Sequence, residues 1–317
     1  MKILVTGGAG FIGSHIADAF IAHGHQVTII DNLVTGRREN INPQATFHLM
    51  DIRDAQIAEV FQRERFEVVC HQAAQMDVRR SVADPRYDAE VNILGTLNLL
   101  QQCKSTGVKK FLFASTGGAI YGEQMRFPAD EEHPTWPASP YGVSKLTCEK
   151  YIFFFAKTCG LRYVFLRYAN VYGPRQSPHG EAGVVAIFST RLLKGEQPVI
   201  NGDGKQTRDY VYVGDVVRAN LLALNYPEND YFNIGTGIET DVNTIFHRLN
   251  EATGAGMKEY HGPTKEGEQL RSVLSYDKAR RLLNWQPKVS LTEGLKETVE
   301  WFRNHVEFST HKDGSRS

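Results

Sequence analysis

The first thirty residues contain the pattern that most limits how this chain can fold. Lys2–Thr6 is a short apolar run that predicts a β-strand, and glycines follow at positions 7, 8, 10 and 13. From Phe11 to His23 the apolar residues recur with the 3.6-residue period of a helix. Glycines between a strand and a helix permit a tight turn and let the backbone approach a pyrophosphate at the helix N-terminus. The pattern therefore predicts a βα unit that binds a dinucleotide.

The next predicted strand ends in an acid that selects the dinucleotide. The apolar run Gln26–Ile30 is followed by Asp31, about 20 residues beyond the glycine loop. A carboxylate at this place accepts hydrogen bonds from an adenosine ribose and repels a 2′-phosphate. Arg37 and Arg38 lie nearby and weaken that preference. We therefore expect NAD rather than NADP as the cofactor.

Strand and helix patterns continue to alternate through the first half of the chain. We expect strands at 45–50, 67–71, 110–115 and 162–167, helices at 55–63 and 141–158, and one or two helices over 84–104. This alternation predicts an α/β fold, a Rossmann-type doubly wound parallel sheet with a smaller C-terminal substrate-binding domain. Ligands bind beyond the C-terminal ends of the strands in such sheets. The polar residues expected near those ends are Asp31, Asp51, Gln72, Ser115 and Arg167.

The pattern loosens after Arg167, where glycine, proline and polar turns become frequent. We expect an NAD-binding domain over 1–168 plus about 211–235, and a smaller substrate-binding domain over about 169–210 and 236–307. The polar tail 308–317 lacks periodicity, so we expect it to be disordered.

Composition excludes several classes of function. Lys plus Arg and Asp plus Glu both total 36, so the zero net charge argues against a nucleic acid or an anionic membrane as partner. No long apolar span or signal peptide is apparent, so we expect a cytoplasmic protein. The four cysteines and 11 histidines show no metal-ligand spacing, and we expect no metal site.

A tyrosine and a lysine lie four residues apart just beyond a predicted helix start. Ser139 and Pro140 favour a helix N-terminus, which puts Tyr141 and Lys145 on one face. An ammonium near a phenol lowers the pKa of the phenol, so Tyr141 could act as a base near neutral pH. Most such pairs are solvated helix surface, but the dinucleotide loop makes the catalytic interpretation the stronger one.

These motifs together resemble those of a known family. The chain resembles the extended short-chain dehydrogenase/reductases, and among them the UDP-glucose (UDP-galactose) 4-epimerases and their relatives, from Met1 to about Arg303. The motifs that carry the resemblance are Thr6–Gly13, Asp31–Leu33, His71–Ala74, Ser115–Gly122, Tyr141–Lys145, Arg167–Arg175 and Arg208–Val211.

The resemblance implies roles for individual residues. Tyr141 would be the base, Lys145 would lower its pKa and hold the nicotinamide ribose, and Thr116 would orient the sugar hydroxyl. The loop after Ser115 and Thr116 is one residue longer than in the common pattern, so Ser115 stays an alternative to Thr116. The residues expected to bind NAD are Gly7, Gly10, Phe11, Ile12, Gly13, Asp31, Asn32, Asp51, Ile52, Gln72, Ala73, Ala74, Asn92, Tyr141, Lys145 and Tyr168.

The resemblance also implies a nucleotide-sugar site. Asn170, Arg208 and Arg271 would contact the substrate with Thr116 and Tyr141, and Lys265 takes the place of an arginine that is common in relatives. Ser272 falls where some epimerases have a large tyrosine that excludes a 2-acetamido group. A small residue there implies that UDP-GlcNAc and UDP-GalNAc are accepted beside UDP-glucose and UDP-galactose.

The expected activity is that of an NAD-dependent UDP-hexose 4-epimerase working through a transient 4-keto sugar. Gly117 and Gly118 stand where dehydratases carry an acid–base carboxylate pair, which argues against a dehydratase. Another nucleotide-sugar epimerase, a reductase or a decarboxylase of the same family stays open, as does an NAD(H)-sensing protein without catalysis. The resemblance further implies a homodimer whose four-helix bundle uses 91–104 and 146–158.

Overall fold

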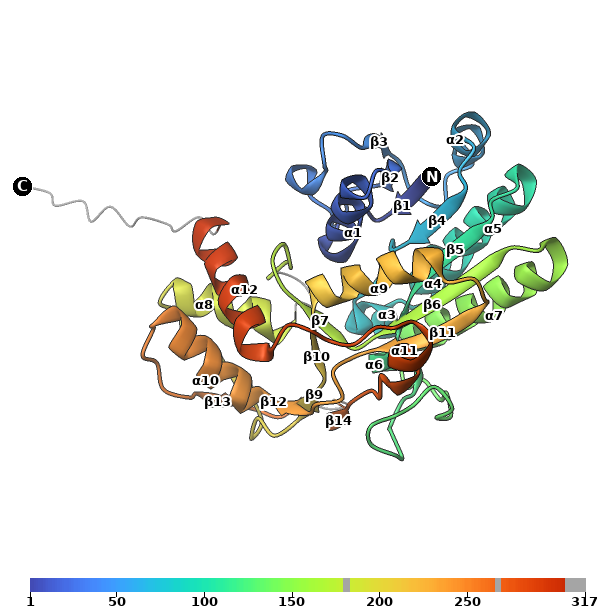
Figure 1. Cartoon of the computed structure of the whole chain (residues 1–317). Helices are drawn as coiled ribbons and strands as arrows, with labels where there is room; N and C mark the ends of the chain where they lie inside the picture. Colours follow the sequence, from blue (N-terminus) through green and yellow to red (C-terminus); the bar gives the residue numbers. More distant parts are fainter. Residues whose placement is uncertain (179–182, 266–268, 306–317) are drawn as a thin grey trace, which may run out of the picture.

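The structure is a computed structural model that describes residues 1–178, 183–265 and 269–305. Seven parallel strands form its central sheet in the order β11-β6-β5-β4-β1-β2-β3 (Figure 1). The strands are β1 Lys2–Thr6, β2 Gln26–Asp31, β3 Thr46–Leu49, β4 Val68–His71, β5 Lys110–Thr116, β6 Arg162–Tyr168 and β11 Asp230–Ile234. The predicted Rossmann-type fold class is therefore confirmed.

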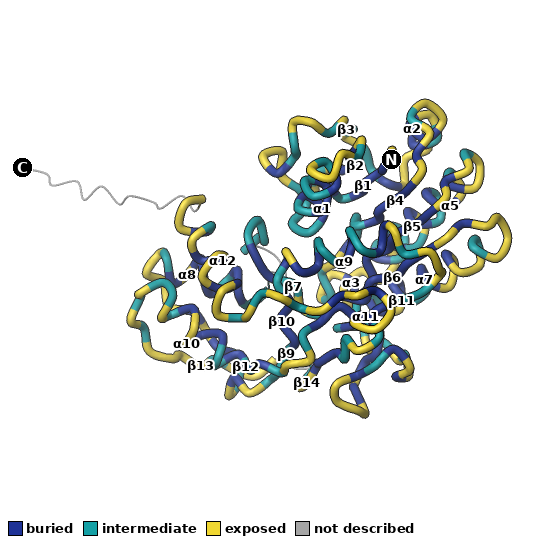
Figure 2. Tube along the Cα trace, in the orientation of Figure 1, coloured by how far each residue is buried: buried dark blue, intermediate teal, exposed yellow. Residues whose placement is uncertain are grey.

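Helices cover both faces of the sheet, which explains why the central strands are almost continuously apolar. One face packs against α1 Phe11–Ala22, α9 Val213–Asn225 and α11 Asp277–Leu282, and the other against α2 Ile57–Glu64, α5 Gly95–Thr106 and α7 Pro140–Cys159. Figure 2 shows the buried strands at the centre of this layer. The two faces bury separate apolar clusters, one on each side of the sheet.

The strand order reverses next to β1, and this reversal places the site. From β1 the chain runs outward through β2 and β3, then returns to β4 on the other side of β1. Thr6 and His71 are register partners at the carboxyl ends of β1 and β4. The loops that leave these two ends therefore open a crevice between them, where nucleotides bind in such sheets.

A second, smaller part of the molecule lies to one side of the carboxyl ends of the strands (Figure 1). Its core is an apolar cluster shared by α8 Val184–Leu193, α10 Val242–Thr253 and α12 Leu291–His305. Short strands connect it: β7 Asn170–Tyr172 with β10 Tyr210–Tyr212, β8 Ile200–Asn201 with β13 His261–Gly262, and β9 Thr207–Arg208 between β12 Thr240–Asp241 and β14 Arg271–Ser272.

The predicted domain limits stay a prediction, but one stretch differs from them. Trp285 lies inside the expected range 236–307, yet its indole packs in the core of the large sheet and its N–H donates to the Asp215 carbonyl (2.9 Å). The reason is that α11 packs on β11 at the edge of that sheet. The expected tail 308–317 lies outside the described residues.

The segment expected as one or two helices over 84–104 is more irregular than predicted. It contains α4 Pro85–Ala89, the π-helical turn η2 Glu90–Leu94 and then α5. The preceding short helix is α3 Val78–Ala83, and the remaining short helices are η1 Arg38–Asn40 and α6 Gly117–Ile120. Within the described ranges, no helix combines the length and apolar character needed to cross a bilayer.

The two parts of the molecule meet around one buried carboxylate. Asp209, between β9 and β10, accepts hydrogen bonds from the backbone N–H groups of Thr236 (2.8 Å), Gly237 (3.1 Å) and Leu274 (3.2 Å). It also accepts the Thr236 hydroxyl (2.6 Å). The segments at Asp209, at Thr236–Gly237 and at Leu274 are therefore held together by one carboxylate.

Candidate active site

The start of α7 positions the predicted catalytic pair. Ser139 caps the helix by accepting the backbone N–H of Gly142 (3.2 Å), and Pro140 occupies the first turn. Tyr141 and Lys145 then lie one turn apart on the same face, with the Lys145 Nζ 5.9 Å from the centre of the Tyr141 ring. The predicted helix start and the shared face are both present.

Lys145 is buried beside the end of β5. Its Nζ donates to the Ala114 carbonyl (2.9 Å) and lies 4.8 Å from the centre of the Phe113 ring. Burial lowers the pKa of Lys145 to about 8. The hydrogen bond to Ala114 therefore fixes the position of the Lys145 ammonium, and the pKa of this group lies close to physiological pH.

The structure separates the two candidate hydroxyls at the end of β5. Ser115 donates to Glu149 Oε1 (2.6 Å), and this carboxylate is in turn held by Arg167 at 3.0 and 2.7 Å, all three side chains being buried. Thr116 instead lines the large cleft beside Tyr141. The geometry therefore favours Thr116 as the hydroxyl that meets a substrate.

The two glycines after Thr116 differ in what surrounds them. A methyl group added at Gly117 would lie 2.4 Å from a Leu274 methyl, because this position faces the core. One added at Gly118 would lie 3.6 Å from Asn170 Oδ1 and 3.9 Å from Thr116 Oγ1, in ordinary contact. A carboxylate side chain at 117 would therefore require the core to repack.

The glycine loop forms a close cradle at the end of β1. Gly7 has φ +70°, and a methyl group there would lie 2.6 Å from the Ala73 nitrogen. A methyl group at Gly13 would lie 2.2 Å from the Gly7 carbonyl oxygen. Among the described residues, no side chain caps the N-terminus of α1 and no acid lies in its first turn, so the N–H groups that follow Gly10, at Phe11 and Ile12, are at a helix end suited to a phosphate.

The adenosine end of the predicted cofactor site is preorganised. Asp31 is buried at the end of β2, where its carboxylate accepts the backbone N–H groups of Ala9 (3.0 Å) and Leu33 (2.8 Å). Burial raises the pKa of Asp31, and these two hydrogen bonds oppose the rise. The carboxylate is therefore held at the sheet edge with its orientation fixed.

Asn32 and Asp51 lie together at the same edge. Asn32 Nδ2 donates to Asp51 Oδ2 (2.8 Å), and Arg53 donates to both Asp51 oxygens (2.8 and 2.9 Å). The hydrogen bond from Arg53 is the main reason that the pKa of Asp51 falls to about 2. Ile52, between Asp51 and Arg53, is buried.

The strand ends of β4 and β6 supply the next predicted contacts. Gln72 Nε2 lies 3.5 Å from the Tyr168 hydroxyl, and the Ala73 nitrogen lies 3.3 Å from Thr6 Oγ1. Ala74 follows on the same partly buried segment. Burial raises the pKa of Tyr168, which also accepts from Asn220 Nδ2 (2.9 Å).

Asn92 is engaged by the protein itself. Its Oδ1 accepts the Gln75 backbone N–H (2.9 Å), and its Nδ2 donates to the Gln75 carbonyl (2.9 Å) and to Asp88 Oδ1 (3.0 Å). The side chain is almost fully buried. A direct contact of Asn92 with NAD therefore stays a prediction, and the structure gives this residue another role.

A cleft of about 1020 Å³ lies between the carboxyl ends of the strands and the smaller part of the molecule. Thr116 and Tyr141 line it on the side of the large sheet, and Asn170 from β7 and Arg208 from β9 line it from the smaller part. The charged residues that line the cleft are Arg79, Glu123, Arg191, Arg208 and Lys265. Among the described residues, four cations against one anion line the cleft, which suits an anionic ligand such as a diphosphate.

Sequence reasoning missed Arg79 and Arg191 because no local motif marks them. Arg191 lies in the last turn of α8, and Arg79 lies in α3 just after the His71–Ala74 motif. Only the folding of α8 over the strand ends brings the two onto one cleft. Gln176, which follows the Arg167–Arg175 motif directly, also lines it.

Two predicted substrate residues are not among the described residues that line the cleft. Arg271 is exposed, pairs with both oxygens of Glu239 and lies 3.7 Å from the centre of the Phe127 ring. Its contact with the substrate stays a prediction. Ser272, buried in β14, is the register partner of Arg208, so the two side chains lie on the same face of this small sheet.

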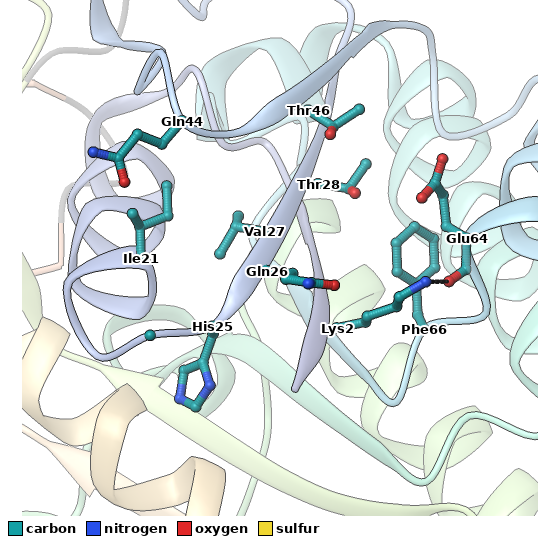
Figure 3. Close-up of a pocket in the computed structure, with 11 residues that line it drawn as sticks. Lys2, Ile21, His25, Gln26, Val27, Thr28, Gln44, Thr46, Glu64 and Phe66 are labelled. Carbon is teal, nitrogen blue, oxygen red and sulfur yellow. Dashed lines mark hydrogen bonds between the residues drawn. The ribbon is translucent and has the colours of Figure 1, made fainter.

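A smaller hollow of about 410 Å³ lies at the opposite edge of the sheet (Figure 3). Lys2, His25 and Gln26 line it near the amino ends of β1 and β2. None of the predicted catalytic or cofactor residues is near it, since these follow the carboxyl ends of the strands. No group of three His, Cys, Asp or Glu residues in the described ranges is arranged to hold a metal ion.

Comparisons with known proteins identify the family of the chain. A model of the NAD dependent epimerase/dehydratase family matches residues 3–235. A protein of Methanocaldococcus jannaschii named a putative UDP-glucose 4-epimerase is 50% identical over 303 residues, which cover 96% of this chain and 99% of that protein.

Two solved structures are similar over nearly the whole chain. A UDP-glucose 4-epimerase of Thermotoga maritima with UDP-glucose has a TM-score of 0.94 at 53% identity, covering 96% of this chain and 99% of that one. A UDP-glucose 4-epimerase of Thermus thermophilus in complex with NAD has a TM-score of 0.91 at 47% identity, covering 96% and 100%. The chain described here therefore belongs to the NAD dependent epimerase/dehydratase family.

Proposed function

We propose that this protein is an NAD-dependent epimerase that interconverts UDP-glucose and UDP-galactose. The observation that carries the proposal is the position of Tyr141 and Thr116 on one cleft, with the buried Lys145 beside Tyr141, at the same sheet edge as the glycine cradle. Relatives that match over the whole chain are named UDP-glucose 4-epimerases, one with UDP-glucose and another with NAD.

The residues present fit NAD. The uncapped N-terminus of α1 suits the pyrophosphate, and the Gly7 and Gly13 positions have no room for a side chain. The fixed carboxylate of Asp31 suits the hydroxyls of an adenosine ribose. NAD held here would supply a reversible hydride acceptor for the sugar C4, so that no cofactor would be consumed.

Tyr141 is the group that moves the proton. As a phenolate it takes the proton of the sugar 4-hydroxyl, and it gives a proton back to the 4-keto group when the sugar is reduced from its other face. The Lys145 ammonium, aimed by the Ala114 carbonyl, stabilises the phenolate. Thr116 holds the sugar hydroxyl in line with Tyr141.

The cations of the cleft hold the diphosphate while the sugar turns over. Arg208, Arg191 and Lys265 come from three different segments of the smaller part of the molecule. A tether at the diphosphate leaves the sugar free to present either face without leaving the protein. Ser272 has a small side chain beside Arg208, and we expect a 2-acetamido sugar to be accepted as well.

We also expect a homodimer, formed through a four-helix bundle of the η2–α5 segment and α7. These helices lie side by side at the edge of the molecule (Figure 1). Their exposed apolar side chains include Leu94 (56% exposed), Tyr151 (39%) and Phe154 (57%). Leu100, by contrast, is fully buried and belongs to the core of the subunit.

A cytoplasmic location stays a prediction from the sequence.

The test is incubation of the purified protein with UDP-galactose, and separately with UDP-GalNAc, without added cofactor. We expect the C4 epimer of each to appear by chromatography. Tyr141→Phe should reduce the rate at least about 100-fold while the protein stays folded and retains NAD. The absence of a C4 epimer from either sugar, in protein that contains NAD, would refute the proposed activity.

A further inference from the structure

Asp88 is a fully buried carboxylate close to the catalytic pair. It lies in α4, and its Oδ2 accepts the Ser144 hydroxyl (2.6 Å). Its Oδ1 accepts Gln75 Nε2 (2.9 Å) and Asn92 Nδ2 (3.0 Å). Ser144 precedes Lys145 directly in α7, so the carboxylate is bonded to the helix that carries the catalytic residues.

The two amides that contact Asp88 can only donate to it. Asn92 uses its oxygen to accept the backbone N–H of Gln75 (2.9 Å), and Gln75 uses its own oxygen to accept the backbone N–H of Asp77 (2.7 Å). Each amide therefore turns its nitrogen toward Asp88. Two amide N–H groups and one hydroxyl converge on the carboxylate, which matches the acceptor-only character of its ionised form.

Two other titratable groups near Lys145 are neutral near pH 8, and a third is already paired with an arginine. Burial lowers the pKa of His71, on β4, to about 3, and burial raises the pKa of Cys148, on α7, to about 11. Glu149 on the same helix is paired with Arg167. Tyr141 is the titratable side chain of α7 whose ring lies near the Lys145 ammonium. From β5, the Phe113 ring and the Ala114 carbonyl contact the same ammonium.

We propose that Asp88 is the buried counter-ion that keeps Lys145 charged beside Tyr141, and that Asn92, Gln75 and Ser144 are positioning residues that hold its carboxylate in place. The role of Asn92 is then to orient this carboxylate. The inference rests on the proposed function, because it takes Tyr141 and Lys145 as the reacting pair.

The energetic reasoning is that a buried ammonium needs compensation. Burial lowers the pKa of Lys145, and Cys148 and Asp88 both act to raise it. Because burial raises the pKa of the Cys148 thiol to about 11, that thiol is uncharged near pH 8, and the buried carboxylate of Asp88 is the group of the two that carries a negative charge. Without the carboxylate the amine loses its proton at a lower pH, so at neutral pH it no longer stabilises the Tyr141 phenolate. The proton state of the catalytic pair is therefore set by a residue that lies outside the cleft lining.

The test measures the titration of Lys145 directly. In NAD-loaded protein labelled with [6-¹³C]lysine, the Lys145 resonance is assigned by its loss in Lys145→Arg and followed against pH. Asp88→Asn, which keeps the size of the side chain, should lower the midpoint by about one pH unit. The alkaline limb of the kcat profile should move by a similar amount. An unchanged midpoint in folded Asp88→Asn would overturn the proposal.

Two further variants separate charge from folding. Ser144→Ala removes one hydrogen bond but leaves the carboxylate, so the midpoint should move much less than in Asp88→Asn. Asp215→Asn neutralises another fully buried carboxylate, which pairs with Arg218 in α9, and it should lower the melting temperature without moving the Lys145 midpoint. An equal shift in Asp215→Asn would assign the effect to folding and count against Asp88.

The two proposals fail in different ways. If the protein does not epimerise any UDP-sugar, the resonance of Lys145 can still be titrated, and a lowered midpoint in Asp88→Asn would show the counter-ion without the activity. If the protein epimerises but the midpoint is unchanged, only the counter-ion is wrong.

Discussion

At the scale of single residues, the hydroxyl pair at the end of β5 shows where sequence reasoning stops. Neighbouring residues of a strand point to opposite faces, so one of Ser115 and Thr116 must face inward. The loop after them is one residue longer than in the common pattern, so an alignment with relatives does not show which of the two hydroxyls faces the substrate. The partner of Ser115, Glu149, is 34 residues away on α7, and only the folded structure reveals that contact.

This difference leads to a prediction for two matched variants. Thr116→Ala should lower kcat about 100-fold with little change in stability, because it removes a hydroxyl from the cleft. Ser115→Ala should instead lower the free energy of unfolding by about 1–2 kcal/mol, because it removes a donor from the buried Glu149, and should leave kcat within a few-fold. Steady-state kinetics and urea unfolding of both variants check this, and the reverse pattern would exchange the two assignments.

Charged residues were harder to place than the glycines. The glycine loop and Asp31 are local, since strand, turn and helix follow one another in the chain. The resemblance placed Arg271 at the substrate and did not mark Arg191, yet Arg271 pairs with Glu239 and Arg191 lines the cleft. Which arginines face a cleft depends on contacts between distant segments, and a motif does not encode those.

At the scale of elements, the sequence predicted the long regular helices better than the short ones. α7 follows the apolar period and has a serine cap, and its start was predicted within one residue. The segment over 84–104 contains a π-helical turn, in which Asn92 is directed onto Asp88 and Gln75. That turn is held by side-chain hydrogen bonds to other segments, so the apolar period alone did not reveal it.

The outer face of α7 leads to a prediction for assembly. Phe154→Lys should convert the expected dimer into a monomer, because Val143, Tyr151 and Phe154 form one exposed stripe that the partner would bury. Phe153→Lys is the matched control, since Phe153 is also exposed (46%) but points about 100° away around the helix. Light scattering of the eluting protein measures the mass. A Phe154→Lys dimer would contradict the interface.

At the scale of the whole molecule, one buried histidine links stability to pH. His71 lies between Thr6 Oγ1 (2.7 Å) and Thr96 Oγ1 (3.0 Å), and burial lowers its pKa to about 3. The unfolded chain binds this proton near pH 6.5 and the folded chain does not, so stability is lost as the pH falls below 6.5.

We expect this histidine to remove about 1.4 kcal/mol of unfolding free energy between pH 7.5 and 5.5. His71→Gln should abolish that share of the pH dependence, whereas His23→Gln, at an exposed position, should retain it. Urea unfolding at the two pH values measures the difference. Equal pH dependence in wild type and His71→Gln would show that another group is responsible.

The carboxylate of Asp209 has a consequence for how specificity can be exchanged between relatives. It ties together segments near β9, β11 and β14, which are widely separated in sequence and all cross between the two parts of the molecule. A recombination that replaces only one of these segments keeps backbone N–H donors but changes how the chain packs around Asp209, so the donors no longer meet the carboxylate with the same distances and angles. New sugar preference should therefore arise more readily from point substitutions within the cleft than from inheritance of a foreign segment, and hybrids should function only when all three segments come from the same parent.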